Sequence, residues 1–268
     1  MARQRWTPDW QAMISHAARI VPPPDAKSVY LVSDSHLGDA HAPPAEFVAL
    51  LERLESPSLL ILMGDLFQVW LALPRYWDGP MRAVLAALQR ARERGIRVVF
   101  VVGNREFFLP RDLASVQRRE LPLDAVVPDM GVLQWGGRRL LFTHGDVVNR
   151  ADHRYLRWRA AARSPWMERG FRLIPGPLAL RLARRIEQQL MRGINLYKLH
   201  LPEEELRAFA ATVLSGHDGA YVGHFHRDLS YSAPGVPGRL RIVPDWLGTR
   251  TVLRLPADGG EEALRLPG

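Results

Sequence analysis

The sequence predicts an α/β fold in which helices cover parallel strands. Five short apolar runs, flanked by glycine or proline, have the length and composition of buried strands. Helical patterns separate the first three runs along the chain, which is typical of parallel strands with helical connections. The five runs are "SVYLVSD", "LLILMGD", "IRVVFVVGN", "RRLLFTHGD" and "AYVGHFH".

Two helices are predicted between the first three runs. Apolar residues recur at helical spacing in residues 47–54 and again in residues 81–88. Gly95 follows the second pattern and supplies a C-terminal cap. Strand, helix and strand thus alternate through the first hundred residues.

The second half of the chain predicts a hairpin, a helix and a final pair of strands. Gly136 and Gly137 stand between two strand-like runs and predict a hairpin turn. Three glutamates, an apolar stripe and Gly216 mark a helix that begins near residue 202. Residues 238–246 and 249–257 are expected to pair with each other as antiparallel strands.

Residues 150–200 break this pattern and predict an inserted helical cap. Arginines outnumber acidic residues there, and apolar side chains are interleaved with them, as expected of amphipathic basic helices. We therefore predict a core of residues 28–149 and 201–268, an N-terminal extension of residues 1–27, and a cap of residues 150–200. The apolar residues of the cap either pack it on the core or bind acyl chains.

Bulk properties narrow the function classes. The 268 residues suit one large domain, or one domain with an insertion, and 47% of them are hydrophobic. The chain has no cysteine, which excludes disulfides, thiol catalysis and cysteine-type zinc sites. We expect no signal peptide, and no run reaches the ~18 apolar residues that a membrane span needs. The net charge of +8 favours an anionic partner: nucleic acid, acidic lipid or a phosphorylated substrate.

Polar residues that can bind metals follow the predicted strands. Asp34 and His36 are two apart, so in an extended segment both side chains would point to one side. Ligands of open α/β sheets bind beyond the carboxyl ends of the strands. Taken singly, the Gly-Asp and Gly-Asn pairs could be turns and the histidines could be structural. Together, these nitrogen and oxygen donors suit two divalent ions such as manganese, iron or zinc. The seven candidates are Asp34, His36, Asp65, Asn104, His144, His224 and His226.

The ordered set Asp-X-His, Gly-Asp, Gly-Asn, His and Gly-His-X-His resembles the calcineurin-like metallophosphoesterases, over roughly residues 28–250. The resemblance implies a four-layer sandwich of two mixed sheets face to face, with helices outside. It also implies two ions, expected to be Mn²⁺, with Asp65 bridging them. The first ion would be held by Asp34, His36, Asp65 and His226, and the second by Asp65, Asn104, His144 and His224.

Within that superfamily, "GDLFQVW", "GNREFFL" and the basic insertion resemble the UDP-2,3-diacylglucosamine diphosphatases of lipid A biosynthesis. These enzymes release UMP and 2,3-diacylglucosamine 1-phosphate. The resemblance implies catalytic roles for Asp65, Asn104, Arg105 and His144, and substrate contacts for Asn104, Arg105, Asp152, Tyr155 and Lys198. Three positions depart from the usual pattern: Gln68 stands for Glu, Glu106 for Asp, and Phe225 for Thr.

The expected reaction is in-line attack on phosphorus by a metal-bridging hydroxide, while Arg105 and His144 stabilise the charge on the phosphoryl oxygens. The expected partners are a UDP-linked acylated sugar and an anionic membrane surface. The expected location is the cytoplasm, at the inner face of the cytoplasmic membrane, without nucleic acid or an obligate protein partner. Two alternatives stay open: a phosphoesterase of this fold acting on nucleotides or nucleic acid, and a scaffold that has lost its metals.

Overall fold

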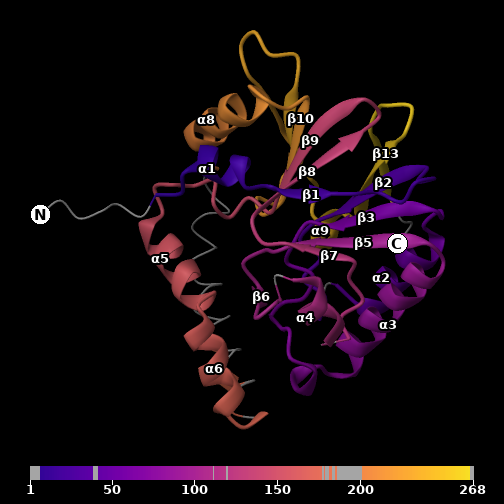
Figure 1. The fold of residues 1–268 in the computed structure, drawn as a ribbon, viewed down its shortest axis with the longest axis vertical. Coiled ribbons are helices and arrows are strands. Elements are labelled where there is room, and N and C mark those ends of the chain that lie inside the picture. The colour runs from indigo at the N-terminus through magenta and orange to yellow at the C-terminus, as the bar shows by residue number, and fades with distance from the viewer. Residues whose placement is uncertain are drawn as a thin grey trace, which may run out of the picture.

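Two mixed sheets of six strands form the centre of the fold (Figure 1). The computed structural model describes residues 7–38, 42–110, 112–118, 120–176, 178, 181, 182, 185 and 201–265. In order across the first sheet lie β1 (Ala18–Ile20), β8 (Met130–Trp135), β9 (Arg138–Thr143), β10 (Gly219–Val222), β12 (Arg239–Ile242) and β11 (Ser230–Ser232). Across the second lie β14 (Glu262–Arg265), β13 (Thr251–Pro256), β2 (Ser28–Val32), β3 (Ser58–Leu62), β5 (Ile96–Val101) and β7 (Ala125–Val127).

Helices cover the outer face of each sheet, so the fold has the four layers that the family resemblance implied. On the first sheet, α8 (Glu203–Leu214) packs against β10 and β12, and α1 (Trp10–Ser15) packs against α8. On the second, α3 (Gly79–Glu93) packs against β5 and α2 (Pro44–Arg53) packs against α3. The smaller α4 (Leu113–Arg118) lies beside β7, and α9 (Trp246–Thr249) precedes β13.

Alternate residues of the central strands face different apolar layers. In β2, Val29 and Leu31 pack between the two sheets, whereas Tyr30 and Val32 pack under α2 and α3. All five residues of β2 are buried, which is why this run reads as continuously apolar. A third apolar layer lies between the first sheet and α8, where Phe209 contacts Trp10 edge to face.

The predicted strands and helices are confirmed. The five apolar runs form β2, β3, β5, β9 and β10. The two helical patterns form α2 and α3, and Gly95 ends α3 with a φ of +96°. Gly136 and Gly137 have φ of +55° and +73° and join β8 to β9 as an antiparallel hairpin.

One predicted pairing is wrong. The two terminal runs form β12 and β13, but these strands belong to different sheets. β12 pairs with β10 and β11, whereas β13 pairs antiparallel with β2 and β14. The reason lies in the connection, since Asp245 begins α9 and the chain passes there from one sheet to the other.

The predicted extension contributes to the first sheet. Within residues 1–27, β1 pairs in parallel with β8, and α1 places Trp10 against α8. The indole N–H of Trp10 donates to the carbonyl of Val147 at 3.2 Å, and the guanidinium of Arg150 lies 3.7 Å from the centre of the Trp10 ring. These residues therefore cover β8 and support the loop that follows β9.

Within the predicted cap, the structure describes α5 (His153–Ala162) and α6 (Pro165–Leu173). Their inward side chains pack on β4 (Trp70–Leu71), β6 (Glu106–Phe107) and the 3₁₀ helix η1 (Pro74–Tyr76). Trp158 lies edge to face with Phe107, and Phe171 lies 5.2 Å from Phe108 between ring centres. The packing explanation therefore holds for these aromatic residues. The predicted boundaries of the cap stay a prediction.

Candidate metal centre

All seven predicted ligand residues lie beyond the carboxyl ends of strands. Residues 34 and 36 follow β2, residue 65 follows β3, and residue 104 follows β5. From the other sheet, residue 144 follows β9, and residues 224 and 226 follow β10. Because β2, β3 and β5 run parallel to one another, and β9 runs parallel to β10, both sheets bring these ends to one place.

The backbone conformation of the candidate ligands differs from the extended one that the sequence suggested. Five of the candidates have left-handed backbone conformations, which L-residues seldom adopt outside special sites. The φ angles are 48° for Asp34, 45° for His36, 54° for Asp65, 70° for His224 and 50° for His226. The premise that Asp34 and His36 lie in an extended segment, with both side chains on one side, is therefore wrong, because β2 ends at Val32 and both residues have left-handed backbone conformations.

Two glycines allow the loops to approach closely. A Cβ on Gly64 would lie 2.6 Å from Nδ1 of His144 and 2.8 Å from the backbone of Gly103. A Cβ on Gly103 would collide with Oδ1 of Asp65. The glycines of the Gly-Asp and Gly-Asn pairs are therefore needed where the loops after β3 and β5 meet the β9 loop.

The first group of donors surrounds Nε2 of His36. This atom lies 3.3 Å from Nε2 of His226, 3.9 Å from Oδ1 of Asp34 and 3.8 Å from Oδ2 of Asp65. The backbone N–H of His224 and the hydroxyl of Ser33 both donate to Oδ2 of Asp34. Oδ1 of Asp34 is buried without a hydrogen-bond partner among the described residues, so it can accept a cation.

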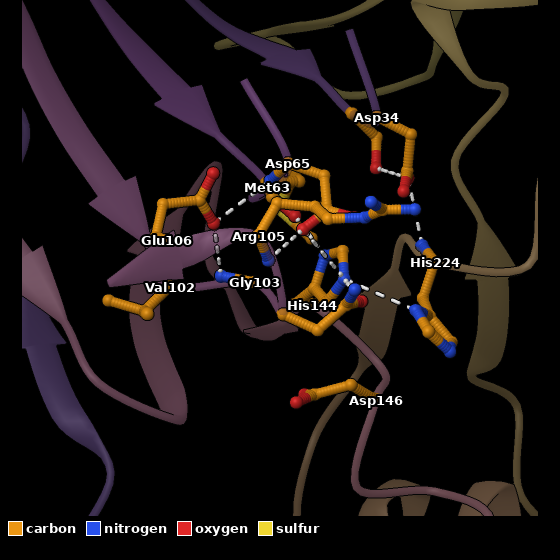
Figure 2. A network of polar contacts seen from close by, with 12 residues as sticks. Asp34, Met63, Asp65, Val102, Gly103, Arg105, Glu106, His144, Asp146 and His224 are labelled. Carbon is orange, nitrogen blue, oxygen red and sulfur yellow. Dashed lines mark hydrogen bonds and ion pairs between the residues drawn. The ribbon is translucent and has the colours of Figure 1, made fainter. Parts of the chain in front are cut away.

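The second group of donors surrounds Nε2 of His144 (Figure 2). Oδ1 of Asn104 lies 3.0 Å from it, Nδ1 of His224 lies 3.3 Å away, and Oδ1 of Asp65 lies 3.6 Å away. Nδ1 of His144 is 2.8 Å from the carbonyl of Met63 and donates its proton there. That hydrogen bond points Nε2 into the group, where it can bind a metal ion once its own proton is displaced.

Asp65 lies between the two groups. Its Oδ2 faces His36 and its Oδ1 faces His144, so each oxygen serves one group. The backbone N–H of Arg105 donates to Oδ1 at 3.0 Å and fixes the carboxylate. Two overlapping clusters, both containing Asp34, bring metal-binding atoms within 4.8 Å of one another: Asp34, His36 and His226, and Asp34, Asp65 and His144. The nitrogen and oxygen donors of the two groups fit divalent ions, and Asp65, with one oxygen toward each group, would serve both.

Burial and nearby charges set the protonation states of the donor side chains. Burial lowers the pKa of His36 to about 3 and that of His224 to about 4, so both imidazoles are neutral at neutral pH. Burial alone would raise the pKa of Asp34, but nearby histidines outweigh it and lower the pKa. Burial alone would also lower the pKa of His144, yet nearby carboxylates, chiefly that of Asp65, raise it to about 9.

Arg105 and Glu106 brace the loops after β3 and β5. The side chain of Arg105 is only 2% exposed, with Nε 3.9 Å from Oδ2 of Asp65. The carboxylate of Glu106 accepts backbone N–H groups from Gly103 at 2.8 Å and from Asp65 and Leu66 at 3.1 Å (Figure 2). Burial and the charge of Asp65 raise the pKa of Glu106 to about 8. The sequence marked Glu106 only as a departure and gave it no role.

Of the three predicted substrate contacts in the cap, the structure describes two, and both make hydrogen bonds within the protein. Asp152 caps α5 by accepting the N–H of Tyr155 at 2.9 Å. The hydroxyl of Tyr155 donates to Asp146 at 2.6 Å. Lys198 lies outside the described residues. The substrate roles of these residues stay predictions.

Asp245 is a further residue of the site that sequence reasoning missed. Its Oδ2 lies 3.5 Å from Nδ1 of His226, on the opposite side of the ring from Asp34. The same oxygen accepts the N–H of Gly248 at 2.6 Å, and the carboxylate thereby orients the imidazole. The sequence offered one indication of this role: Asp245, within "PDW", follows a strand-like run, as the predicted ligands do.

Two sheets with helices outside, and paired metal-binding groups where strands of both sheets end, define a phosphoesterase of the metal-dependent kind. Residues 28–228 match the family described as calcineurin-like phosphoesterase, and the chain belongs to that family. The chain is therefore a phosphoesterase enzyme, and the predicted resemblance is confirmed.

Several relatives share one printed name, UDP-2,3-diacylglucosamine hydrolase. The relative from Sodalis glossinidius is 31% identical over 238 residues, covering 87% of this chain and 95% of its own. The relative from Ralstonia nicotianae is 29% identical, covering 81% and 83%. The relative from Vibrio cholerae serotype O1 (El Tor Inaba N16961) is 26% identical, covering 83% and 92%.

Proposed function

We propose that this phosphoesterase hydrolyses the diphosphate of UDP-2,3-diacylglucosamine to UMP and 2,3-diacylglucosamine 1-phosphate, with two divalent ions bound. The proposal rests on the position of Asp65 between the two donor groups, where one carboxylate oxygen faces His36 and the other faces His144. The relatives named UDP-2,3-diacylglucosamine hydrolase support the choice of substrate.

The two ions would be held by the residues of the two donor groups. The first site would use Asp34, His36, Asp65 and His226, and the second would use Asp65, Asn104, His144 and His224. When bound, such ions lower the pKa of a coordinated water and draw charge from phosphoryl oxygens. Mixed imidazole and carboxylate donors suit manganese, iron or zinc, and of these we expect Mn²⁺ from the family resemblance.

The chain's own residues orient the diphosphate. Arg105 follows Asn104 directly, and its guanidinium offers a planar fork of donors to phosphoryl oxygens. His144 lies beside Asn104 and would stabilise charge on the same group through the ion that its Nε2 would hold, because its Nδ1 donates to Met63. Burial of Arg105 keeps water from its guanidinium, which strengthens its interaction with an anion.

The cap offers apolar surface for acyl chains. A hollow of about 390 Å³ lies between the start of α6 and the core. Phe108, Leu109, Val126 and Pro128 supply its apolar wall, while Glu106, Asp112, Arg163 and Glu168 place charged groups in the same hollow. Burial of each methylene there would contribute about 0.8 kcal/mol to binding.

The outer surface of α6 supports a location at an anionic membrane. Trp166 is 76% exposed and Leu173 is 86% exposed, and Arg169 and Arg172 lie on the same helix. Apolar side chains next to arginines suit a surface of acidic lipid. None of the helices in the described part of the chain combines the length and apolarity that crossing a bilayer requires. We therefore propose peripheral attachment, at the inner face of the cytoplasmic membrane.

Substrate release measurements test the proposed reaction. The manganese-loaded protein in detergent should release UMP from UDP-2,3-diacylglucosamine and leave UDP-N-acetylglucosamine intact. Metal analysis of the same preparation should find two ions per chain. No release from the folded, metal-loaded protein would refute the substrate and direct the search to nucleotides and other phosphodiesters.

Vesicle binding tests the membrane proposal separately. The protein should sediment with vesicles containing phosphatidylglycerol and stay free with phosphatidylcholine alone. Leu173→Ser should weaken this binding, whereas Leu264→Ser, at an exposed leucine of β14, should not. Equal binding by both variants would show that α6 is not the attachment surface.

A further inference from the structure

A buried charge network joins α5 to the loops of the second donor group. Tyr155, Arg159 and Arg163 are four residues apart and form one stripe along the helix. The side chains of both arginines are less than a fifth exposed, and that of their partner Asp146 is 2% exposed. Asp146 follows His144 by two residues, and Figure 2 shows it beneath that histidine. The described functional site does not use this network.

Arg159 connects two loops. Its Nε donates to Oδ2 of Asp146 at 2.6 Å, and its terminal nitrogen donates to Oδ1 of Asp129 at 2.5 Å. Asp129 follows β7, and its carbonyl accepts the hydroxyl of Thr143 at the end of β9. One guanidinium thus ties the β7 and β9 loops to the helix.

Arg163 reaches the loop of Asn104. It donates to the carbonyl of Gly103 at 3.0 Å and to the carbonyl of Val102 at 3.4 Å. It also donates to the carbonyl of Pro128 at 3.0 Å and to Oδ1 of Asp129 at 3.1 Å. Only a planar group with several donors can serve acceptors spread in this way, which a lysine ammonium cannot.

The first donor group is supported by a different segment. The N–H of Trp246 donates to the carbonyl of Ser33 at 2.8 Å, and the N–H of Leu247 donates to the carbonyl of Asp34 at 3.2 Å. Asp245 in the same segment orients His226. The two donor groups therefore depend on separate supports, one from α9 and one from α5.

We propose that Arg159 and Arg163 are positioning residues, which hold Asn104 and His144 in place for the second metal ion and link that site to the cap. The inference rests on the proposed two-ion function for its metal readout. It predicts that loss of these contacts weakens the second ion selectively. Residues that orient metal ligands typically change affinity by about 10- to 100-fold.

Lysine substitutions provide the test, because they keep the charge beside the buried carboxylates. Arg163→Lys and Arg159→Lys should each lower the affinity for the second Mn²⁺ by about 10- to 100-fold and leave the first within about twofold. Arg157→Lys, at an exposed position of α5, is the matched control. Calorimetric Mn²⁺ titration measures both constants, without reference to turnover.

Hydrogen exchange of the metal-free protein tests the contacts independently of any ion. Amides of residues 103–105 in Arg163→Lys, and of residues 144–147 in Arg159→Lys, should exchange about tenfold faster or more, because hydrogen bonds of the guanidinium are lost. Amides of residues 33–37 should be unchanged. Unchanged exchange in the first two segments would overturn the inference, even if the wild-type protein bound no second ion and the proposed function failed. Faster exchange with an unchanged affinity for the second Mn²⁺ would also overturn the inference, because the arginines would then hold the loops without positioning the metal ligands.

Discussion

Binding of the second metal ion should depend on pH, whereas binding at His36 should not. Carboxylates of Asp65, Asp34 and Asp146 outweigh burial and raise the pKa of His144 from 6.5 to about 9. Below that pH, Nε2 of His144 carries a proton that a metal ion must displace. His36, with a pKa of about 3, is already neutral above pH 5 and has no proton to release.

The expected magnitude follows from one released proton. Between pH 6 and pH 8 the association constant of the second ion should rise by about 100-fold, or ~2.7 kcal/mol, and it should level off above about pH 9. His36 should not change the association constant of the first ion between pH 6 and pH 8, because its imidazole is neutral throughout this range. The affinity of the second site must rise with pH, because the raised pKa of His144 in the metal-free protein favours the protonated form, which cannot bind metal at Nε2.

Calorimetric titration with Mn²⁺ measures this linkage directly. Titrations in two buffers of different ionisation enthalpy should give close to one proton released with the second ion at pH 7. In His144→Gln that proton should be absent. A second constant that stays level from pH 6 to pH 8 in the wild-type protein would refute the argument, because it would show that the carboxylates do not hold a proton on His144.

Three further predictions concern single substitutions. Asp65→Ala should abolish turnover and lower metal content with an unchanged circular dichroism spectrum, because its oxygens face both donor groups; near wild-type turnover would remove Asp65 from the mechanism. Arg105→Ala should lower kcat by about 10²- to 10³-fold and keep the metal content, and metal loss would mean that Arg105 supports Asp65 instead. Phe47→Ala should lower the free energy of unfolding in urea by about 3–5 kcal/mol, because this buried ring packs edge to face on Trp246; a loss below about 1 kcal/mol would show that the core refills the space.

The sequence was sufficient to predict the central strands, the covering helices and the residues that gather at the strand ends. Continuous apolar runs such as residues 58–62 can only be buried on both faces, which implies layers on both sides. Once the strands are parallel, polar residues at their ends must converge. The candidate ligands could therefore be named without knowledge of any distance.

Other features depend on contacts between distant segments and could not be predicted. The separation of β12 from β13 depends on how Asp245 and Trp246 pair with Ser33, more than two hundred residues away in the chain. The bonds from Arg163 to Gly103 also join distant segments, and an arginine-rich helix does not reveal which guanidinium is buried. Glu106 was visible in the sequence, but its hydrogen bonds to Asp65 and Leu66 depend on the meeting of two loops.

The left-handed ligand residues show where the geometry of the centre is held. Such conformations persist only where the surrounding structure fixes them. Here the N–H of Asp34 donates to the carbonyl of Gly64, and the N–H of His36 donates to the carbonyl of Asp65. Backbone hydrogen bonds thus join the loop after β2 to the loop after β3. Glycines, backbone hydrogen bonds and the Glu106 carboxylate set the approach of these loops, and Oδ1 of Asp34, Nε2 of His36 and Oδ2 of Asp65 face one another in the first donor group. This separation explains why sequence rules for strands fail at these positions while the metal-binding residue types remain easy to recognise.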